Sequence, residues 1–269
     1  MNFVPIIAKL RSFAPLHLAE SWDNVGLLVD APPTTNSTSK AILLTNDFTP
    51  AVLAECRRKQ IGLVVCYHPL IFPSFNRLNS QDNWKAKVVV EAIQAGISLY
   101  TPHTAADACT GGVNDWLASA FEPIGLLSTV PITPSASCSK VGAGRLIELR
   151  EPITLSLACG LLKDHLNVQF LRATRAPSKG AFIKKIAICA GSGASLFKEV
   201  QSADLFVTGE AGHHFALDVQ ERGSALVLCE HSTSERGWLK AVLKPELESL
   251  SAEFQVFVSE ADVEPLCVV

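Results

Sequence analysis

A unit of helix, glycine, short apolar strand and histidine occurs three times in this chain. The copies read CRRKQIGLVVCYH, EAIQAGISLYTPH and VQERGSALVLCEH, and they end at His68, His103 and His231. Open α/β sheets bind ligands beyond the carboxyl ends of their strands, which is where these histidines stand. Imidazole is also the commonest metal ligand among side chains. The repeat therefore predicts three imidazoles that converge at one strand-end rim of an α/β fold.

Apolar strand-like runs alternate with helical patterns along the rest of the chain. This alternation predicts an α/β (α+β layered) body with mixed sheets covered by helices. Strands are expected at 41–44, 63–66, 97–100, 185–189, 205–207 and 225–229, with a closing strand at 253–259. Helices are expected near 50–59 and 84–95, after Asp107, and near 213–222.

Three stretches have the composition of loops, at residues 31–39, 131–139 and 173–180. The second favours a boundary between an N-terminal lobe, 1–130, and a C-terminal lobe, 131–269. None of the three is long enough to act as a flexible linker, so the two lobes are expected to form one compact body.

The overall composition excludes one class of function. The chain has 269 residues, 48% of them hydrophobic, and a formal net charge of -3. This is enough apolar material for a large core or two joined lobes. The longest basic run is Arg57-Arg58-Lys59, far from the dense positive charge that nucleic-acid backbones require. Direct nucleic-acid binding is therefore not expected.

The eight cysteines contain no C-x-x-C pair, and most of them lie inside apolar runs. Reduced thiols in a protein core are therefore expected rather than disulfides or zinc ribbons. The N-terminal residues lack the features of a signal peptide, and no stretch is long enough to span a bilayer. These patterns predict a cytoplasmic protein without membrane contact, and they leave a nuclear or mitochondrial pool open.

Two of the three histidines begin the same short motif. His103 to Asp107 and His231 to Glu235 both read H-[ST]-x-x-[DE]. One interpretation is a capping box, in which the carboxylate only satisfies backbone donors at a helix start. That interpretation does not account for the histidine or for the preceding repeat. The alternative is an imidazole and a carboxylate that bind metal together, and acids of this kind can bridge paired ions.

Two further segments are candidates for the same rim. TGEAGHH follows the strand expected at 205–207, so Glu210 and His214 are candidates to contact the metal ligands or the substrate. The loop from Gly191 to Ser195 follows another strand and has two interpretations. It could present backbone N–H groups to an anion, or it could be a tight strand-to-helix turn.

At these residues the chain resembles the NGG-interacting-factor-three-like family, also known as GTP cyclohydrolase type 2-like proteins. The resemblance rests on ESWDNVGLLVD, YHPLIF, YTPHTAADACTGGVNDWLA, CAGSGAS, TGEAGHH and EHSTSERG, which occur in family order from Glu20 to Gly237. It implies two similar α/β lobes with metal at strand carboxyl ends between them, and a toroidal homohexamer built from dimers or trimers. Some members carry an inserted middle domain, for which the length of this chain leaves no room.

The resemblance also implies a set of site residues. One or two divalent ions per subunit would be held by His68, Asp107, His231 and Glu235, with His103 as a candidate base. Many bacterial members have a second histidine where this chain has Tyr67. Because neutral tyrosine is a poor ligand, one of the two metal positions is expected to be weak. The mixed donor set suits zinc, iron, manganese or nickel, and does not choose among them.

The leading functional hypothesis is a metal-dependent hydrolase whose activated water attacks a nucleotide or another heterocycle. The family name implies GTP ring opening, although a family does not fix a substrate. Two alternatives remain open at this point. The protein could act as an interaction partner in transcription regulation with a structural metal site, or it could store and deliver metal ions.

Overall fold

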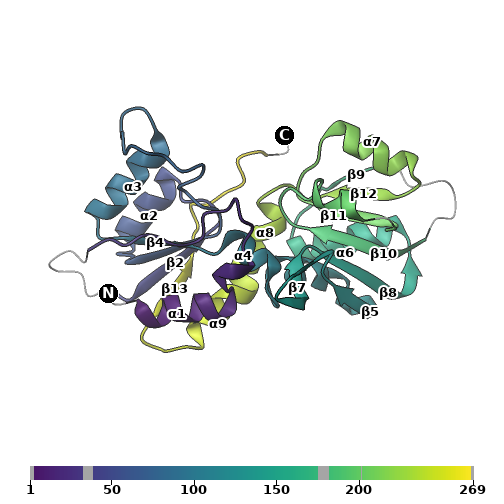
Figure 1. Cartoon of the computed structure of the whole chain (residues 1–269), viewed down its shortest axis with the longest axis horizontal. Helices are drawn as coiled ribbons and strands as arrows, with labels where there is room; N and C mark the ends of the chain where they lie inside the picture. Colours follow the sequence, from purple (N-terminus) through teal and green to yellow (C-terminus); the bar gives the residue numbers. More distant parts are fainter. Residues whose placement is uncertain (1–2, 33–38, 175–181, 201, 268–269) are drawn as a thin grey trace. The chain divides into compact units, whose positions relative to one another are not determined.

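The computed structural model describes residues 3–32, 39–174, 182–200 and 202–267 (Figure 1). The chain divides into two compact units. Unit 1 comprises Met1–Ala106 together with Leu239–Val269, and unit 2 comprises Asp107–Trp238. Each unit has its own sheet with helices packed on it, so the α/β class predicted from the sequence is confirmed.

This division differs from the lobe boundary expected at 131–139. The chain leaves unit 1 inside α4 (His103–Ala108) and returns to it at Leu239. The return has a clear cause, because β13 (Gln255–Val258) pairs in parallel with β2 (Ala41–Thr45) and completes the first sheet. The loops expected at 31–39 and 173–180 lie mostly outside the described residues.

Unit 1 contains a five-stranded sheet in the order β1-β4-β3-β2-β13. Its strands from β4 to β13 are parallel, and β1 pairs with β4 in the antiparallel sense. The remaining strands are β1 (Gly26–Val29), β3 (Leu63–Cys66) and β4 (Ser98–Thr101). Every residue of β2, β3 and β4 is buried, as expected for parallel strands with helices on both faces.

Figure 1 shows helices on both faces of this sheet. The pair α2 (Pro50–Arg58) and α3 (Trp84–Gln94) covers one face, and α1 (Val4–Phe13) and α9 (Lys244–Glu248) cover the other. Side chains from α2, α3 and the strands form one apolar core cluster. Together these layers hold the ends of β3 and β4 in fixed positions.

The repeat found in the sequence is confirmed as helix, glycine and strand in all three copies, but its glycines have two different causes. Gly96 and Gly223 have φ values of 70° and 81°, the left-handed conformation that ends a helix. In the first copy Gln60 takes that conformation, with φ of 54°. Gly62 is small for another reason, since a Cβ there would lie 2.8 Å from the ring of Phe3.

Unit 2 contains a six-stranded sheet in the order β5-β8-β10-β11-β12-β9. Its centre is parallel, from β10 to β12, and the outer pairs are antiparallel. The strands are β5 (Leu126–Val130), β8 (Arg145–Ile153), β9 (Arg172–Ala173), β10 (Ile183–Cys189), β11 (Leu205–Thr208) and β12 (Ala225–Leu228).

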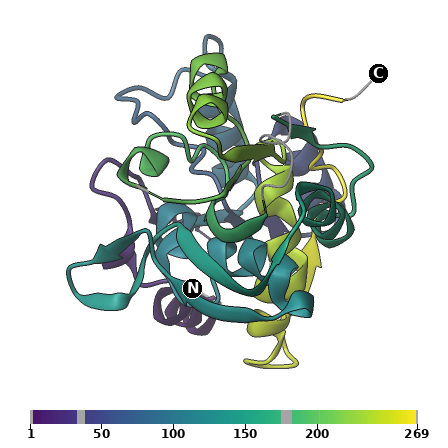
Figure 2. The ribbon, with the colours of Figure 1, turned by 90° about the vertical axis from the view of Figure 1, so that its right-hand side faces the viewer.

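The helices of unit 2 pack on this sheet and on one another. α5 packs against β8 and β10, α7 packs against β12, and α6 packs against α8. Their bounds are α5 (Val113–Ala118), α6 (Leu155–Leu166), α7 (His213–Glu221) and α8 (Thr233–Trp238). Residues 131–139, expected as a loop, lie mostly in a hairpin of β6 (Thr133–Ser135) and β7 (Cys138–Ala143), which extends from the unit in Figure 2.

The cysteines are all free thiols, and four of the eight are buried. Burial raises the pKa of Cys56 and of Cys229 to about 12, so both thiols stay protonated near neutral pH. Cys138 and Cys267 are exposed, so the expectation of core thiols holds for only part of the set. Among the described residues, no helix combines the length and the apolar character needed to cross a membrane.

Candidate functional site

Two of the predicted histidines meet at one edge of the sheet in unit 1. His68 stands two residues after β3, and His103 is the first residue of α4, just after β4. Because β3 and β4 are parallel neighbours, their carboxyl ends lie at the same edge. The two imidazole rings are 5.5 Å apart between centroids and nearly perpendicular.

Tyr67 packs beside this histidine pair. Its side chain is 1% exposed, and its ring centroid lies 5.0 Å from that of His68 and 5.6 Å from that of His103. Tyr67 therefore contacts both imidazoles from within the core. Whether its presence weakens a metal position stays a prediction.

The imidazoles of His68 and His103 are oriented by carboxylates from two different loops. Asp47 Oδ1 lies 3.1 Å from Nδ1 of His68, and Asp23 Oδ1 lies 2.8 Å from Nδ1 of His103. A carboxylate that accepts from one ring nitrogen fixes the tautomer and leaves the lone pair on the other. In both residues Nε2 is therefore the nitrogen suited to bind a metal or exchange a proton.

The Asp23 carboxylate is fully buried and anchors the start of α4. It accepts hydrogen bonds from the backbone N–H of Thr104, at 3.1 Å, and from the Thr104 hydroxyl. Burial alone would raise the pKa of Asp23, but the hydrogen bonds from His103 and Thr104 outweigh it, so the pKa lies below its ordinary value. Asp23 is therefore an ionised partner for His103 at neutral pH.

The contacts of Thr104 also bear on the capping-box interpretation. The Thr104 hydroxyl donates to Asp23 and accepts from the backbone N–H of Glu20 at 3.0 Å. The hydroxyl thus ties α4 to the segment 20–23. This tie to a distant segment is a role that a local cap does not require.

Unit 2 carries the third histidine of the repeat. His231 follows β12, and its side chain lies between two glutamates. Its Nδ1 is 3.1 Å from Oε1 of Glu210, and its Nε2 is 3.4 Å from Oε1 of Glu235. His231 is about one-third exposed, whereas Glu235 is 3% exposed. An imidazole beside a buried carboxylate is a fitting donor pair for a divalent cation.

Glycines give His231 and Glu235 the room to approach the loop after β10. A Cβ at Gly191 would lie 2.5 Å from Oε1 of Glu235 and 3.2 Å from Nε2 of His231. Gly191 also has φ of 62°, which side-chain-bearing residues rarely adopt. A Cβ at Gly209 would lie 2.8 Å from the His231 Cα. These close approaches explain glycine at both positions.

The same loop does not behave as an anion cradle. Gly191 N–H donates to the Ser234 hydroxyl at 2.8 Å, and Gly193 N–H donates to the Thr208 hydroxyl at 2.9 Å. These donors are already used within unit 2, and only a short 3-10 helix (Leu196–Glu199) follows. Of the two interpretations of residues 191–195, the structure favours the tight turn.

Asp107 contributes negative charge in unit 2. It lies on α4, one turn after His103, and is partly exposed. Burial is the main cause that raises the pKa of Cys189 far above its ordinary value, and the charges of Asp107 and Glu235 raise it further. Both carboxylates therefore act on one thiol, which indicates a concentration of negative charge in this region.

The structure departs from the predicted arrangement in one respect. The strand before His231 belongs to the second sheet, so the three imidazoles do not share the rim of one sheet. The candidate ligands are divided between the units, with His68 in unit 1 and Asp107, His231 and Glu235 in unit 2. His214 is exposed at the start of α7 beside His213, whereas Glu210 contacts His231 as a neighbour of the candidate ligand.

Sequence reasoning missed Asp23 and Asp47, the two carboxylates that orient the histidines of unit 1. Asp23 lies in ESWDNVGLLVD, which marked the family but suggested no contact with His103. Asp47 follows β2, the strand next to β3, so its place at a strand end was the available signal.

The fold is that of a mixed α/β protein. His68, His103 and His231 stand at strand ends, each with a carboxylate beside one ring nitrogen, and such imidazole and carboxylate groups fit a divalent cation. The chain belongs to the DUF34/NIF3 family, because the family model described as Duf34/NIF3 (NGG1p interacting factor 3) matches residues 1–265. The resemblance seen in the sequence motifs is thereby confirmed.

Two relatives show how far the similarity extends. The chain is 40% identical to NIF3-like protein 1 of Drosophila melanogaster, over 98% of this chain and 88% of the relative. It is 36% identical to NGG1-interacting factor 3 of Saccharomyces cerevisiae, over 98% and 96%. A solved hypothetical protein of Staphylococcus aureus is similar with a TM-score of 0.82 at 26% identity, covering 98% of both chains.

Proposed function

We propose that this protein is a metal-dependent hydrolase acting on a nucleotide or another heterocyclic substrate. One or two divalent ions would be held by His68, Asp107, His231 and Glu235. The observation that carries the proposal is that carboxylates orient the imidazoles and leave one ring nitrogen of each for a ligand. Carboxylates hold Nδ1 of His68 and of His231, and His68, His231 and Glu235 each offer one ligand atom.

The burial of Glu235 supports a cation at this site. A carboxylate that is 3% exposed loses hydration, which is costly unless a positive partner compensates. Glu235 contacts His231, which also lies against a second carboxylate, Glu210. A divalent cation would be attracted by these two carboxylates and would lower the pKa of a water that it binds to about 7.

His103 is proposed as the proton-transfer group. Its Nδ1 is held by the ionised Asp23, so Nε2 can accept a proton from the attacking water and later return it to the leaving group. Asp23 stabilises the imidazolium that forms when the proton arrives. Tyr67, packed on both imidazoles, keeps the rings of His68 and His103 in place.

An interaction role is the second candidate. The yeast relative carries the name NGG1-interacting factor 3, and it is 36% identical over nearly the whole chain. In this version the metal has a structural role and the protein serves as a regulatory partner. A protein that stores or delivers metal ions is a separate alternative. A homohexameric assembly and a cytoplasmic location belong to both versions as proposals.

Metal analysis followed by a turnover screen tests the proposal. Zinc, iron, manganese and nickel are measured in the purified protein, and the metal-restored protein is screened against nucleotides and other heterocycles. Asp107→Ala and His231→Ala should lose bound metal and turnover while native mass persists. His17→Ala, at an exposed histidine outside the proposed site, is the matched control.

Two results would contradict the proposal that the protein is a metal-dependent hydrolase. One is turnover that survives removal of all metal. The other is loss of the native oligomer in Asp107→Ala and His231→Ala together with no turnover by any form, which would favour the structural metal.

A further inference from the structure

Two aromatic side chains stand exposed at the histidine edge of unit 1. Trp22 is 57% exposed and Phe72 is 37% exposed, and their ring centroids are 5.9 Å apart in an edge-on arrangement. Large aromatic rings normally contribute to a core, and two in contact at the surface form an apolar patch that a flat ligand could cover.

The loops that carry these rings are anchored at their backbones. The Asn24 side chain donates to the carbonyl of Ile71 at 2.8 Å, which ties the segment after Trp22 to the segment before Phe72. Lys85 Nζ donates to the Phe72 carbonyl at 2.8 Å, and Asp23 is fixed by Thr104. Trp22 and Phe72 are therefore presented on a preorganised support, which lowers the entropy cost of binding.

The exposed pair lies beside the proposed proton-transfer group. The Trp22 ring centroid is 6.1 Å from that of His103, with the rings nearly perpendicular. Asp23, next to Trp22 in the chain, binds Nδ1 of the same imidazole. One short segment thus supplies both the exposed indole and the carboxylate that orients His103.

We propose that Trp22 and Phe72 form a stacking platform for a nucleobase-type, planar heteroaromatic ring of the substrate. The platform would bind the ring within reach of His103, so a compound without such a ring would lose the contact. This inference deepens the proposed function, because it assigns the residues that bind the ring of the substrate and rests on His103 as the proton-transfer group. Its binding step requires no chemistry and can be measured alone.

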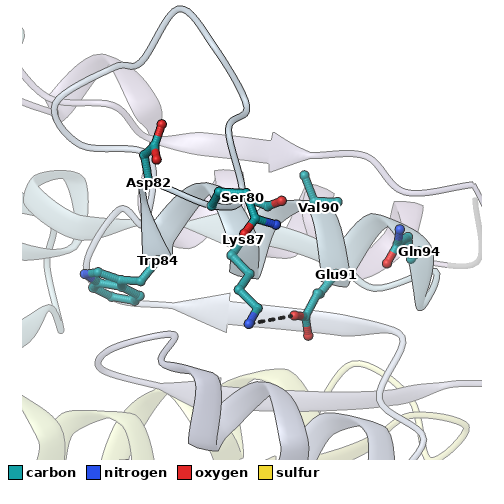
Figure 3. Close-up of a pocket in the computed structure, with 8 residues that line it drawn as sticks. Ser80, Asp82, Trp84, Lys87, Val90, Glu91 and Gln94 are labelled. Atoms are coloured by element: carbon teal, nitrogen blue, oxygen red, sulfur yellow. Dashed lines mark ion pairs between the residues drawn. The ribbon is translucent and has the colours of Figure 1, made fainter.

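Another exposed tryptophan provides a matched control. Trp84 is 51% exposed on α3 and lines a shallow pocket of about 590 Å³ with Lys87 and Glu91 (Figure 3). Lys87 and Glu91 form an ion pair at 4.0 Å across one turn of that helix. The pocket contains no histidine, so a substitution of Trp84 changes a similarly exposed indole that is not part of the proposed platform.

Equilibrium dialysis of the full chain with guanosine and adenosine tests the platform, with ribose 5-phosphate as the non-aromatic probe. Trp22→Ala should weaken nucleoside binding by about tenfold to a hundredfold, the range found for single base–aromatic stacks. Trp22→Phe should retain most of the affinity, and Phe72→Leu should give a smaller loss. Trp84→Ala should leave binding unchanged.

The measurement is made on metal-loaded and on chelator-treated protein, so that stacking is separated from hydrolysis. Nucleoside binding that survives His103→Ala but not Trp22→Ala supports the platform, even if no turnover is found. The proposal is overturned if Trp22→Ala binds nucleosides as the native chain does, or if ribose 5-phosphate displaces them. A changed native mass in Trp22→Ala would also overturn it, because the patch would then be an interface between copies.

Discussion

The two units use the same helix–glycine–strand–histidine repeat to build different surroundings for imidazole. In unit 1 two imidazoles pack on each other and on Tyr67, and each is oriented by an aspartate from a neighbouring loop. In unit 2 the single imidazole of His231 lies between Glu210 and Glu235, next to glycines that leave no room for a side chain.

The main feature of unit 1 is the fixed orientation of the His68 and His103 imidazole rings, whereas that of unit 2 is the negative charge of its carboxylates. Aromatic packing and contacts with carboxylates fix ring positions in unit 1, which suits proton transfer and recognition of a flat substrate. In unit 2, three carboxylates surround or approach one imidazole and one thiol, an arrangement that suits a cation. Under the proposed function, the same repeat would therefore support two chemical tasks, depending on which residues follow the strand.

Unit 1 has a further feature, a buried carboxylate that secures its C-terminal segment. The fully buried Glu55 carboxylate accepts from the Ser259 hydroxyl, from the backbone N–H groups of Glu260 and Ala261, and from Lys59. Burial by itself raises the Glu55 pKa, but these hydrogen bonds outweigh it and lower the pKa from 4.5 to about 2.

The largest expected effect follows from this lowered pKa. The shift corresponds to roughly 3 kcal/mol of stability, which is fully present above the ordinary pKa of 4.5 and is lost as the pH falls toward about 2. Glu55→Gln should remove about that amount at neutral pH, measured by urea unfolding, and should flatten the acid limb of stability. An unchanged acid limb in Glu55→Gln would contradict this account.

The next effect concerns Gly191, which lies against Glu235 and His231 in unit 2. Gly191→Ala places a Cβ 2.5 Å from Oε1 of Glu235 in a left-handed conformation, which costs about 1–2 kcal/mol before any displacement of the carboxylate. Bound metal should fall at least several-fold in elemental analysis. Gly212→Ala is the control, because nothing lies within 4 Å of its Cβ and its φ is -73°. Equal metal content in the two variants would contradict the steric explanation.

Much of the fold was predictable because its signals are local. The repeat marked α2, α3, α7 and the strand after each, and the closing strand was expected at β13. The division into units was not predictable in the same way, because it depends on β13 pairing with β2 across more than two hundred residues. The sheet to which β12 belongs is also a long-range property, so three equivalent strand ends did not mean one rim.

The residues of the candidate site likewise separate into those with a local sequence signal and those that depend on long-range contacts. His68, His103 and His231 were found because they belong to the repeat, and Glu210 was found because it follows β11. Asp23 and Asp47 were missed because their partners lie 80 and 21 residues away in the chain. Trp22 was missed for a different reason: an exposed tryptophan has the same letter as a buried one, and only packing distinguishes it from Trp238.

A carboxylate exchange in unit 1 is expected to have a moderate effect. Asp47→Asn keeps the size of the side chain but removes the charge that fixes the His68 tautomer. Substitution of a carboxylate that orients a metal-binding histidine typically lowers metal affinity by about 10–100-fold. Titration with zinc should therefore show weaker binding in Asp47→Asn, with native-like stability in urea. Tight binding in the variant would mean that His68 is not a ligand or does not need orientation.

The smallest expected effect comes from the matching exchange in unit 2. Glu210 lies 3.1 Å from Nδ1 of His231 as Asp47 lies 3.1 Å from Nδ1 of His68, but the Glu210 side chain is 53% exposed and that of Asp47 is 43% exposed. Water competes more readily for the more exposed contact, so Glu210→Gln should weaken zinc binding somewhat less than Asp47→Asn, by about tenfold, at the lower end of the range for such partners. Comparing the two variants in one titration tests the contrast between the units directly. If Glu210→Gln caused the larger loss of zinc affinity, solvent exposure would not decide how much each carboxylate contributes.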